Sequence, residues 1–248
     1  MCQCRGNRIS MICQEPMVSL NPLSSIGNQL GEVVRLHKKV SRAEADKQVI
    51  EMLRTVGIPS PETRLKQYPF ELSGGMRQRA MIAMALLCDP EVLIADEPTT
   101  ALDVTIQAQI LDLLKELNRK MGTSIIMITH DLGVIASMVD TVAVMYCGRI
   151  VEKASVRQLF HDPLHPYTRG LLNSIPKVGR TEGDLQTIEG AVPSIYNLPA
   201  GCAFSNRCGE CGRICKEKEP PTLQLEDGRV VKCWKYTPQW GEEGADHE

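Results

Sequence analysis

The sequence lacks several features that would mark common classes of protein. It contains no Gly-Lys dipeptide, so no Gly-x-x-x-x-Gly-Lys-Ser/Thr phosphate-binding loop occurs in the 248 residues given. The longest apolar run, residues 80–88, is far too short to cross a bilayer. A net charge of −2 gives no basic field, which argues against nucleic acid as a partner. No apolar segment follows Arg5 and Arg8, so we expect no signal peptide.

The absence of a signal peptide predicts a cytosolic, reducing environment, in which disulfides are an unlikely use of ten cysteines. Five of the ten fall between Cys202 and Cys233, and this clustering needs an explanation of its own. Others, such as Cys88 and Cys147, are expected to be small residues of the core.

Strands alternate with helices over the first 150 residues or so, which predicts an α/β fold with a parallel sheet. The predicted strands are residues 8–13, 91–95, 124–128 and 141–147, the last turning at Gly148. The predicted helices are residues 24–57 with a break near 39–40, 75–87, and 106–121 ending at Gly122. From residue 155 onward, frequent prolines predict a less regular extension.

The segment Ser73-Gly74-Gly75 should place a hydroxyl and free backbone N–H groups at the start of a helix. Such a helix end binds anions, because its first amides have no partner within the helix and its dipole is positive there. An ordinary helix cap explains the segment equally well when it is taken alone.

Asp96 and Glu97 follow a buried strand, and His130 follows the next strand along the chain. Ligands of open α/β sheets gather at the carboxyl ends of the strands, so these side chains are candidates for one site. Adjacent residues of a strand point to opposite faces, so the two carboxylates should have different tasks. Either feature alone would more often be a solvated strand end or a loop histidine.

Taken together, these segments resemble the conserved motifs of an ABC-type ATPase. Residues 72–78 resemble the signature motif, 92–98 the Walker B motif, 100–103 the D-loop, and Gln14 and His130 the Q-loop glutamine and switch histidine. The resemblance implies that Glu97 is the catalytic base and that His130 contacts the γ-phosphate of ATP. It also implies that Asp96 and Gln14 hold Mg²⁺. Together with these two, Ser73, Gly74, Gly75, Met76 and Asp103 are expected to bind the nucleotide cofactor.

Further segments narrow the resemblance to the ATPase subunits of oligopeptide/dipeptide ABC importers. They are residues 14–22, the methionine at Met76, residues 162–168, and residues 201–208 continuing to Cys233-Trp234. The resemblance runs from about Arg5 to Trp234. It implies a second ABC ATPase subunit, two membrane permeases, an external substrate-binding protein, and a peripheral location on the cytoplasmic face of the membrane. It departs from the family pattern at Cys13, where an aromatic residue is usual, and in the missing Walker A motif.

The cysteines Cys202, Cys208, Cys215 and Cys233 are spaced x₅, x₆ and x₁₇, with Cys211 as an extra. Four thiols in a loop-rich segment are typical of soft metal sites. Some members of the resembled family carry a [4Fe–4S] cluster here, so we expect one, with structural zinc or unligated thiols as the alternatives.

The predicted fold is therefore an ABC-type P-loop NTPase core, N-terminally truncated, with a helical subdomain and an irregular cysteine-rich extension. We expect the ATPase domain at 1–154, its helical subdomain at about 22–90, and the extension at 155–248. The chain is either a true ATPase whose phosphate loop lies outside this sequence, or a silent scaffold that supplies its signature motif to a partner. In either case we expect it to be inactive alone. A chromosome-maintenance ATPase is disfavoured, because no coiled-coil heptads occur. The transported substrate is not encoded in this subunit.

Overall fold

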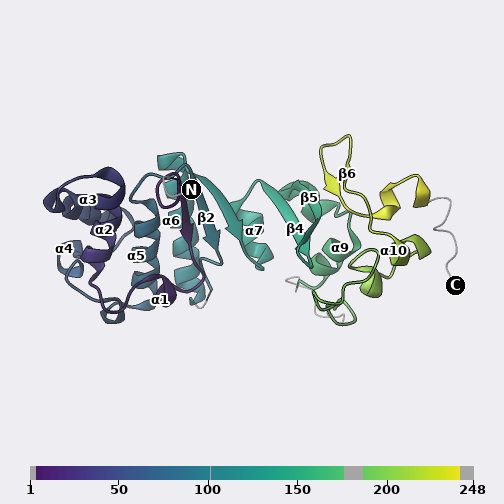
Figure 1. Cartoon of the computed structure of the whole chain (residues 1–248), viewed down its shortest axis with the longest axis horizontal. Helices are drawn as coiled ribbons and strands as arrows, with labels where there is room; N and C mark the ends of the chain where they lie inside the picture. The colour runs from purple at the N-terminus through teal and green to yellow at the C-terminus, as the bar shows by residue number, and fades with distance from the viewer. Residues whose placement is uncertain (1–3, 101, 176–186, 241–248) are drawn as a thin grey trace. The chain divides into compact units, whose positions relative to one another are not determined.

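The computed structural model describes residues 4–100, 102–175 and 187–240. The chain forms two compact units, Met1–Val134 and Ile135–Glu248, here called the N-terminal and C-terminal units (Figure 1). Their division falls within α7 (Leu132–Met138), whereas the sequence suggested a domain boundary at 154/155. The compact units and the predicted functional domains are thus different divisions of the chain.

The N-terminal unit contains a parallel sheet in the order β1-β2-β3. The strands are β1 (Ile9–Ile12), β2 (Val92–Asp96) and β3 (Ser124–Ile128), and each lies within a few residues of its predicted bounds. Residues Ile9 and Val92 are paired at the start of β1, and Asp96 is paired with Ile128 at the end of β3. All three strands therefore end at one edge of the sheet, as predicted.

The helices of the N-terminal unit follow local signals in the sequence. They are α1 (Pro16–Ser19), α2 (Ile26–Lys38), α3 (Arg42–Thr55), α4 (Pro61–Arg64), α5 (Gly74–Leu86) and α6 (Val104–Met121), with a 3₁₀ turn η1 (Pro69–Glu71). Lys39 adopts a left-handed conformation with φ of 53°, which ends α2 where a break was expected. Gly122, with φ of 68°, ends α6 in the same way.

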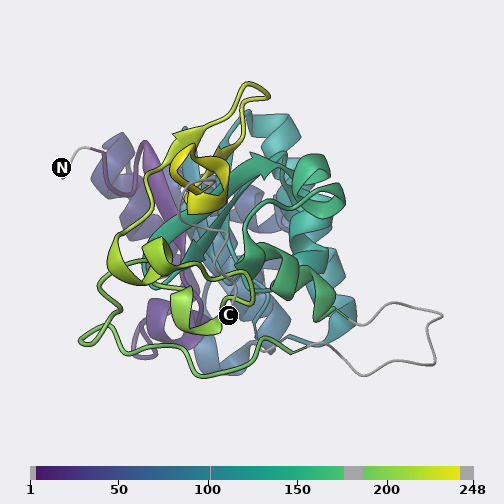
Figure 2. The ribbon, with the colours of Figure 1, turned by 90° about the vertical axis from the view of Figure 1, so that its right-hand side faces the viewer.

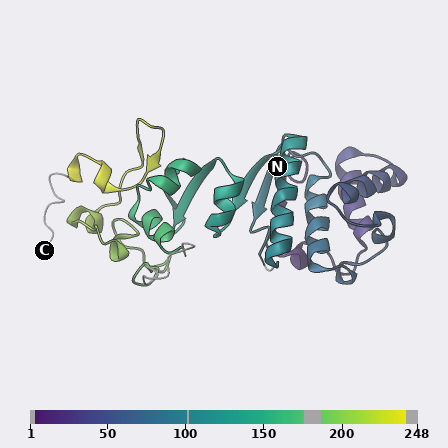
Figure 3. The same ribbon diagram turned by 180° about the vertical axis from the view of Figure 1, so that it is seen from behind.

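The helix α5 packs against β1, and α5 and α6 lie side by side (Figures 1 and 3). Their separation is small enough that a Cβ atom on Gly75 would lie 3.2 Å from Ile106 Cγ2. The helices α2 and α3 pack together and both contact α5. Their interior is apolar, with Leu30 and Leu53 fully buried. This helical layer holds the start of α5 in a fixed place relative to the sheet.

The C-terminal unit has an antiparallel sheet in the order β4-β5-β7-β6. Its strands are β4 (Thr141–Tyr146), β5 (Arg149–Ser155), β6 (Leu223–Gln224) and β7 (Val230–Val231), and the loop between β6 and β7 extends outward (Figure 2). The expectation that 141–147 belongs to the parallel sheet is wrong. Cys147 and Gly148 both have positive φ, 46° and 75°, and such a two-residue turn folds β5 back on β4 as a hairpin.

The expected irregularity of the extension is only partly correct. The described residues include α8 (Val156–His161), α9 (Pro166–Asn173), α10 (Arg213–Glu217) and the 3₁₀ turns η2 (Ser205–Arg207) and η3 (Trp234–Tyr236). Each is short, which explains why periodicity did not reveal it.

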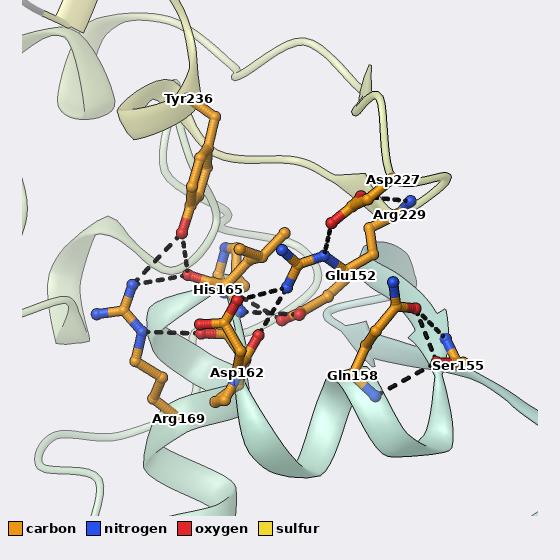
Figure 4. A network of polar contacts seen from close by, with 11 residues as sticks. Glu152, Ser155, Gln158, Asp162, His165, Arg169, Asp227, Arg229 and Tyr236 are labelled. Atoms are coloured by element: carbon orange, nitrogen blue, oxygen red, sulfur yellow. Dashed lines mark hydrogen bonds and ion pairs between the residues drawn. The ribbon is translucent and has the colours of Figure 1, made fainter.

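A buried carboxylate organises the start of α9 (Figure 4). Glu152 has no exposed surface, and its two oxygens accept the backbone N–H groups of Leu164 and His165 at 2.8 Å each. His165 in turn accepts the N–H of Tyr167 through Nδ1 at 3.1 Å and so caps α9. Nearby, the Arg229 guanidinium donates to Asp162 Oδ2 at 3.0 Å. Segment 162–168, singled out in the sequence, is thus fixed by specific polar contacts.

No helix within the described ranges is sufficiently long and apolar to traverse a membrane.

We predict that the C-terminal unit loses stability as the pH falls from about 6.5 to about 4. Burial, reinforced by the charge of Arg169, lowers the pKa of His165 from 6.5 to about 4. Below pH 6.5 the unfolded chain therefore binds a proton that the folded state does not bind, and the folded state is disfavoured by roughly 3 kcal/mol at the end of this window. Urea unfolding, followed by tryptophan fluorescence, measures this unit, because Trp234 and Trp240 both belong to it.

The variant His165→Asn keeps a side-chain acceptor at the helix cap and removes the titrating ring. Its unfolding free energy should vary less with pH over the window than that of the wild type. His161→Asn, at an exposed position, should keep the wild-type dependence. Equal pH dependence in the wild type and His165→Asn would contradict the prediction.

Candidate functional site

The Glu97 carboxylate is the centre of a polar cluster at the carboxyl end of the parallel sheet. Its Oε2 accepts hydrogen bonds from Thr100 Oγ1 at 2.7 Å and from Gln14 Nε2 at 2.9 Å. Its Oε1 lies 2.8 Å from His130 Nδ1. Gln14, Glu97 and His130 follow β1, β2 and β3 respectively, so the sheet brings together three residues predicted to share a site.

The backbone at Glu97 adopts an unusual conformation. Its φ of 44° lies in the left-handed region, which costs a non-glycine residue about 1–3 kcal/mol. The N–H of Glu97 still donates to the carbonyl of Ile128 at 2.9 Å, and its carbonyl accepts the N–H of Thr100 at 3.1 Å. Strand alternation therefore stops at Asp96, and a turn rather than the pleat of β2 directs Glu97.

The contacts of Glu97 favour its charged form. The Thr100 hydrogen bond first, and then the contact with His130, lower the pKa of the Glu97 carboxyl below its usual range. The side chain of Glu97 is 21% exposed, whereas that of His130 is 79% exposed. The carboxylate is therefore anionic at neutral pH and sheltered, and the histidine is open to an incoming ligand.

Asp96 and Gln14 remain candidates for holding Mg²⁺. Asp96 ends β2 directly before Glu97, and Gln14 contacts Glu97 through its amide nitrogen, which orients its oxygen elsewhere. Within the described residues, no three His, Cys, Asp or Glu side chains form a metal-binding group. Mg²⁺ commonly takes one or two protein ligands and completes its shell with phosphate and water.

The signature segment forms the start of α5 as predicted. Ser73 Oγ accepts the N–H of Met76 at 3.3 Å and caps the helix. The two glycines differ in environment. Gly75 faces Ile106 of α6 at close range, whereas a Cβ atom on Gly74 would meet nothing within 4 Å. Packing inside the chain thus accounts for Gly75 and leaves Gly74 facing open space.

Asp103 has a structural role in this chain. Its Oδ1 accepts the N–H of Ile106 at 2.9 Å and caps α6. Further along α6, Gln107 Nε2 donates to Asp131 Oδ2 at 3.2 Å, which joins the helix to the loop that carries His130. Ala101, in the predicted D-loop, lies outside the described residues.

Sequence reasoning missed two residues of this region. Thr100 was included in a motif but given no task, although a hydroxyl three residues after a carboxylate is a pattern that predicts a local contact. Gln78 is 2% exposed, and its Nε2 donates to the carbonyl of Pro98. No local signal in the sequence identifies that contact, because it joins residues far apart in the chain.

The four cysteines of the predicted metal site are gathered in the C-terminal unit. Cys202, Cys208, Cys215 and Cys233 line one cavity together with His165. Cys211 does not line it, which favours Cys215 where the sequence left the choice open. Among the described residues, no three His, Cys, Asp or Glu side chains, these cysteines included, are arranged to hold a metal ion. The donor chemistry therefore suits a soft metal, whereas the geometry gives the [4Fe–4S] prediction no support.

Burial keeps the thiols of Cys202, Cys208 and Cys233 protonated. It raises the pKa of Cys208 to about 12 and that of Cys233 to about 11, and it also raises the pKa of Cys202. Metal binding requires thiolates, so a bound cation would have to supply the charge that lowers these values.

The sequence matches two protein families, "ABC transporter" over residues 2–100 and "Oligopeptide/dipeptide transporter, C-terminal region" over residues 151–215. Among curated relatives, the oligopeptide transport ATP-binding protein AppD of Bacillus subtilis is 53% identical over 99% of this chain and 74% of its own length. A probable peptide ABC transporter ATP-binding protein, y4tR of Sinorhizobium fredii, is 55% identical over 95% of this chain and 70% of its own.

Solved structures resemble part of the chain. The ATP-binding cassette MJ0796, in a dimeric post-hydrolysis state with ADP and Pi, has a TM-score of 0.54 at 27% identity, over 61% of this chain and 64% of that one. The cbiO1 protein of Clostridium perfringens, part of the ABC transporter complex cbiONQ, has a TM-score of 0.55 at 30% identity, over 62% and 60%. The motifs around Glu97, the family matches and these relatives agree: the chain belongs to the ATP-binding subunits of the oligopeptide/dipeptide ABC transporter family, and it is an ABC-type ATPase.

Proposed function

We propose that this chain is a motor subunit of a membrane importer for peptides or related small solutes, in which ATP-driven closure of an ATPase dimer energises transport. The observation that carries the proposal is the convergence of Gln14, Glu97 and His130 from the ends of three adjacent strands. The names of the relatives, which describe oligopeptide and peptide transport, supply the substrate class.

In this proposal each residue of the cluster has a separate task. The sheltered Glu97 carboxylate is the base that polarises the attacking water, and exposed His130 donates to the γ-phosphate of ATP. Thr100 and Gln14 hold the Glu97 carboxylate in place. Mg²⁺, held by Asp96 and Gln14, would neutralise charge on the phosphates.

The signature segment serves a different nucleotide in this proposal. Ser73, Gly74 and Met76 at the start of α5 face the ATP bound by a second ATPase subunit, and Asp103 lies at the same dimer surface. Gly74 supports this arrangement, since nothing in its own chain fills the space beside it. A helix start with an open glycine allows close approach of phosphate to backbone N–H groups.

We further propose that the chain works on the cytoplasmic face of the membrane, bound to two permease subunits and served indirectly by an external substrate-binding protein. The support is the C-terminal family match, which covers residues 151–215. The permeases and the external protein, rather than this subunit, would select the transported solute.

A second candidate is a catalytically silent scaffold that supplies Ser73 to Met76 to the partner's nucleotide. It needs only the start of α5 in this chain, where Gly74 faces open space. The two candidates differ in one measurable respect, namely whether ATP turnover of the assembled transporter depends on Glu97.

For the motor proposal we predict that Glu97→Gln lowers ATP turnover of the assembled transporter by about 10²–10⁴-fold, because the general base is lost. Nucleotide binding should persist, since the amide keeps the size of the side chain. The measurement is phosphate release together with nucleotide binding by calorimetry. Glu91→Gln is the matched control, because Glu91 is an exposed carboxylate that pairs with Arg8 on the surface. Turnover unchanged by Glu97→Gln would exclude Glu97 as the base and favour the scaffold.

We also predict that Ser73→Arg abolishes hydrolysis at the partner's nucleotide and spares the nucleotide bound by this chain. The arginine would occupy the space that the partner's phosphates need. Ser41→Arg is the control, because Ser41 caps α3 through the same contact, to the N–H of Glu44 at 3.3 Å. Single-turnover assays distinguish hydrolysis at the two sites. One assay uses a partner with its catalytic glutamate intact, and the other uses a partner in which that glutamate is replaced. Failure of this chain's own site alone would refute the assignment.

For the C-terminal unit, the [4Fe–4S] cluster stays a prediction. Four thiols at one cavity are a sufficient donor set, but binding would require them to rearrange, because they do not form a metal-binding group as they lie here. Such a cluster would stabilise a unit whose helices are short.

Anaerobically purified protein should therefore be brown and contain iron, with broad absorption near roughly 400 nm, as thiolate-ligated iron gives. Cys202→Ser should remove the colour, whereas Cys88→Ser, at a buried thiol of the N-terminal unit, should keep it. Colourless protein with stoichiometric zinc would show that the thiols hold zinc and not an iron–sulfur cluster. Colourless protein without metal would leave unligated thiols and contradict both.

A further inference from the structure

Gln78 is a polar side chain in the buried face of α5. It is 2% exposed, and its buried neighbours along the helix include Ala80, Met81 and Ile82. Burying a long amide side chain restricts its rotamers and removes its polar atoms from water, both of which cost free energy. A specific contact must therefore offset this cost.

That contact is with the turn that carries the catalytic carboxylate. The Gln78 Nε2 group donates to the carbonyl of Pro98, the residue directly after Glu97. Pro98 is buried and, as a proline, has no backbone N–H. The turn therefore has one hydrogen-bond donor fewer than a turn without proline. The side-chain amide of α5 thus bonds the Pro98–Thr99 peptide unit, one residue beyond Glu97.

The turn needs such support because Glu97 holds a left-handed backbone conformation, with φ of 44°. Among the described residues, three hydrogen bonds fix its backbone. The N–H of Glu97 bonds the Ile128 carbonyl on β3, the N–H of Thr100 bonds the Glu97 carbonyl within the turn, and Gln78 bonds Pro98 from α5. A conformation that is disfavoured in isolation persists only where its surroundings fix it.

Loss of this conformation would move the carboxylate. The contacts of Glu97 with His130 and Gln14, at 2.8 and 2.9 Å, depend on the direction in which the turn presents the side chain. Relaxation of φ toward the strand region would turn the carboxylate away from both. The hydrogen bond of Gln78 is therefore part of what keeps Glu97 beside His130.

We propose that Gln78 is a positioning residue for Glu97, which fixes the catalytic turn to the helix that begins at Ser73. The inference rests on the proposed function, in which Ser73 faces the partner's nucleotide and Glu97 acts at the nucleotide bound by this chain. Movement of α5 when one nucleotide binds would then be transmitted through the Gln78 amide to the base at the other nucleotide.

The test is Gln78→Met in the full chain, which keeps the length of the side chain and removes the donor. The readout is the ¹⁵N signal of His130 Nδ1, the atom that lies beside Glu97 Oε1, recorded at one fixed pH without nucleotide. Glu97→Gln supplies the reference signal for an altered contact. A core-filling role for Gln78 would leave the His130 signal unchanged.

The matched control is Arg79→Met, at the next position of the same helix. Arg79 donates to the carbonyl of Val56 and to Gln109 Oε1, so it joins α5 to α3 and α6 and not to the catalytic turn. Loss of this side chain should destabilise the same helix without moving Glu97.

We expect Gln78→Met to shift the His130 signal toward the Glu97→Gln value, and Arg79→Met to leave it at the wild-type value. The amide of Thr100 should also exchange with solvent about tenfold faster in Gln78→Met, because the turn opens more often. If Gln78→Met does not fold, Gln78→Asn tests the same point, since its shorter amide does not reach Pro98. A wild-type His130 signal in the folded variant would overturn the proposal. Because no nucleotide is present, this result is independent of whether the transporter's turnover depends on Glu97.

Discussion

Parallel pairing of β1 and β3 with the two sides of β2 is the constraint on which the candidate site depends. It places the carboxyl ends of all three strands at one edge, so that Gln14, Glu97 and His130 meet although they are widely separated in the chain. The pairing alone does not aim the side chains. The left-handed turn at Glu97 does so, and contacts from β3 and α5 hold that turn.

The C-terminal unit is stabilised by different means. Its sheet contains two strands of only two residues each, and its helices are short. Buried polar and aromatic contacts compensate. Glu152 fixes the start of α9 through two backbone N–H groups, and the ring of Phe204 packs against those of Tyr146 and Tyr167. The stability of this unit therefore depends more on individual side-chain contacts than on long helices or strands. The cavity lined by its four cysteines is likewise formed by individual side chains.

Local signals in the sequence were sufficient to predict most of the N-terminal unit. Apolar runs located β2 and β3, and Ser73 and Gly122 marked helix ends, because each depends on residues close in the chain. The hairpin of β4 and β5 was misassigned, since a strand's apolar pattern does not tell its direction. The left-handed turn at Glu97 and the distances between the cysteine sulfur atoms depend on contacts between distant segments. No local pattern encodes such contacts.

The glycine pair of the signature segment shows how structure separates residues that the sequence presents as one motif. Gly75 is required by the close approach of α6, because a side chain there would press on Ile106. Gly74 has no such neighbour, so packing within the chain gives no reason for a residue that weakens a helix by about 1 kcal/mol relative to alanine. A reason outside the chain fits: a phosphate that approaches the backbone at the start of α5. Under the proposed function, the first glycine would contact the partner's nucleotide, whereas the second is needed for the packing of α5 against α6.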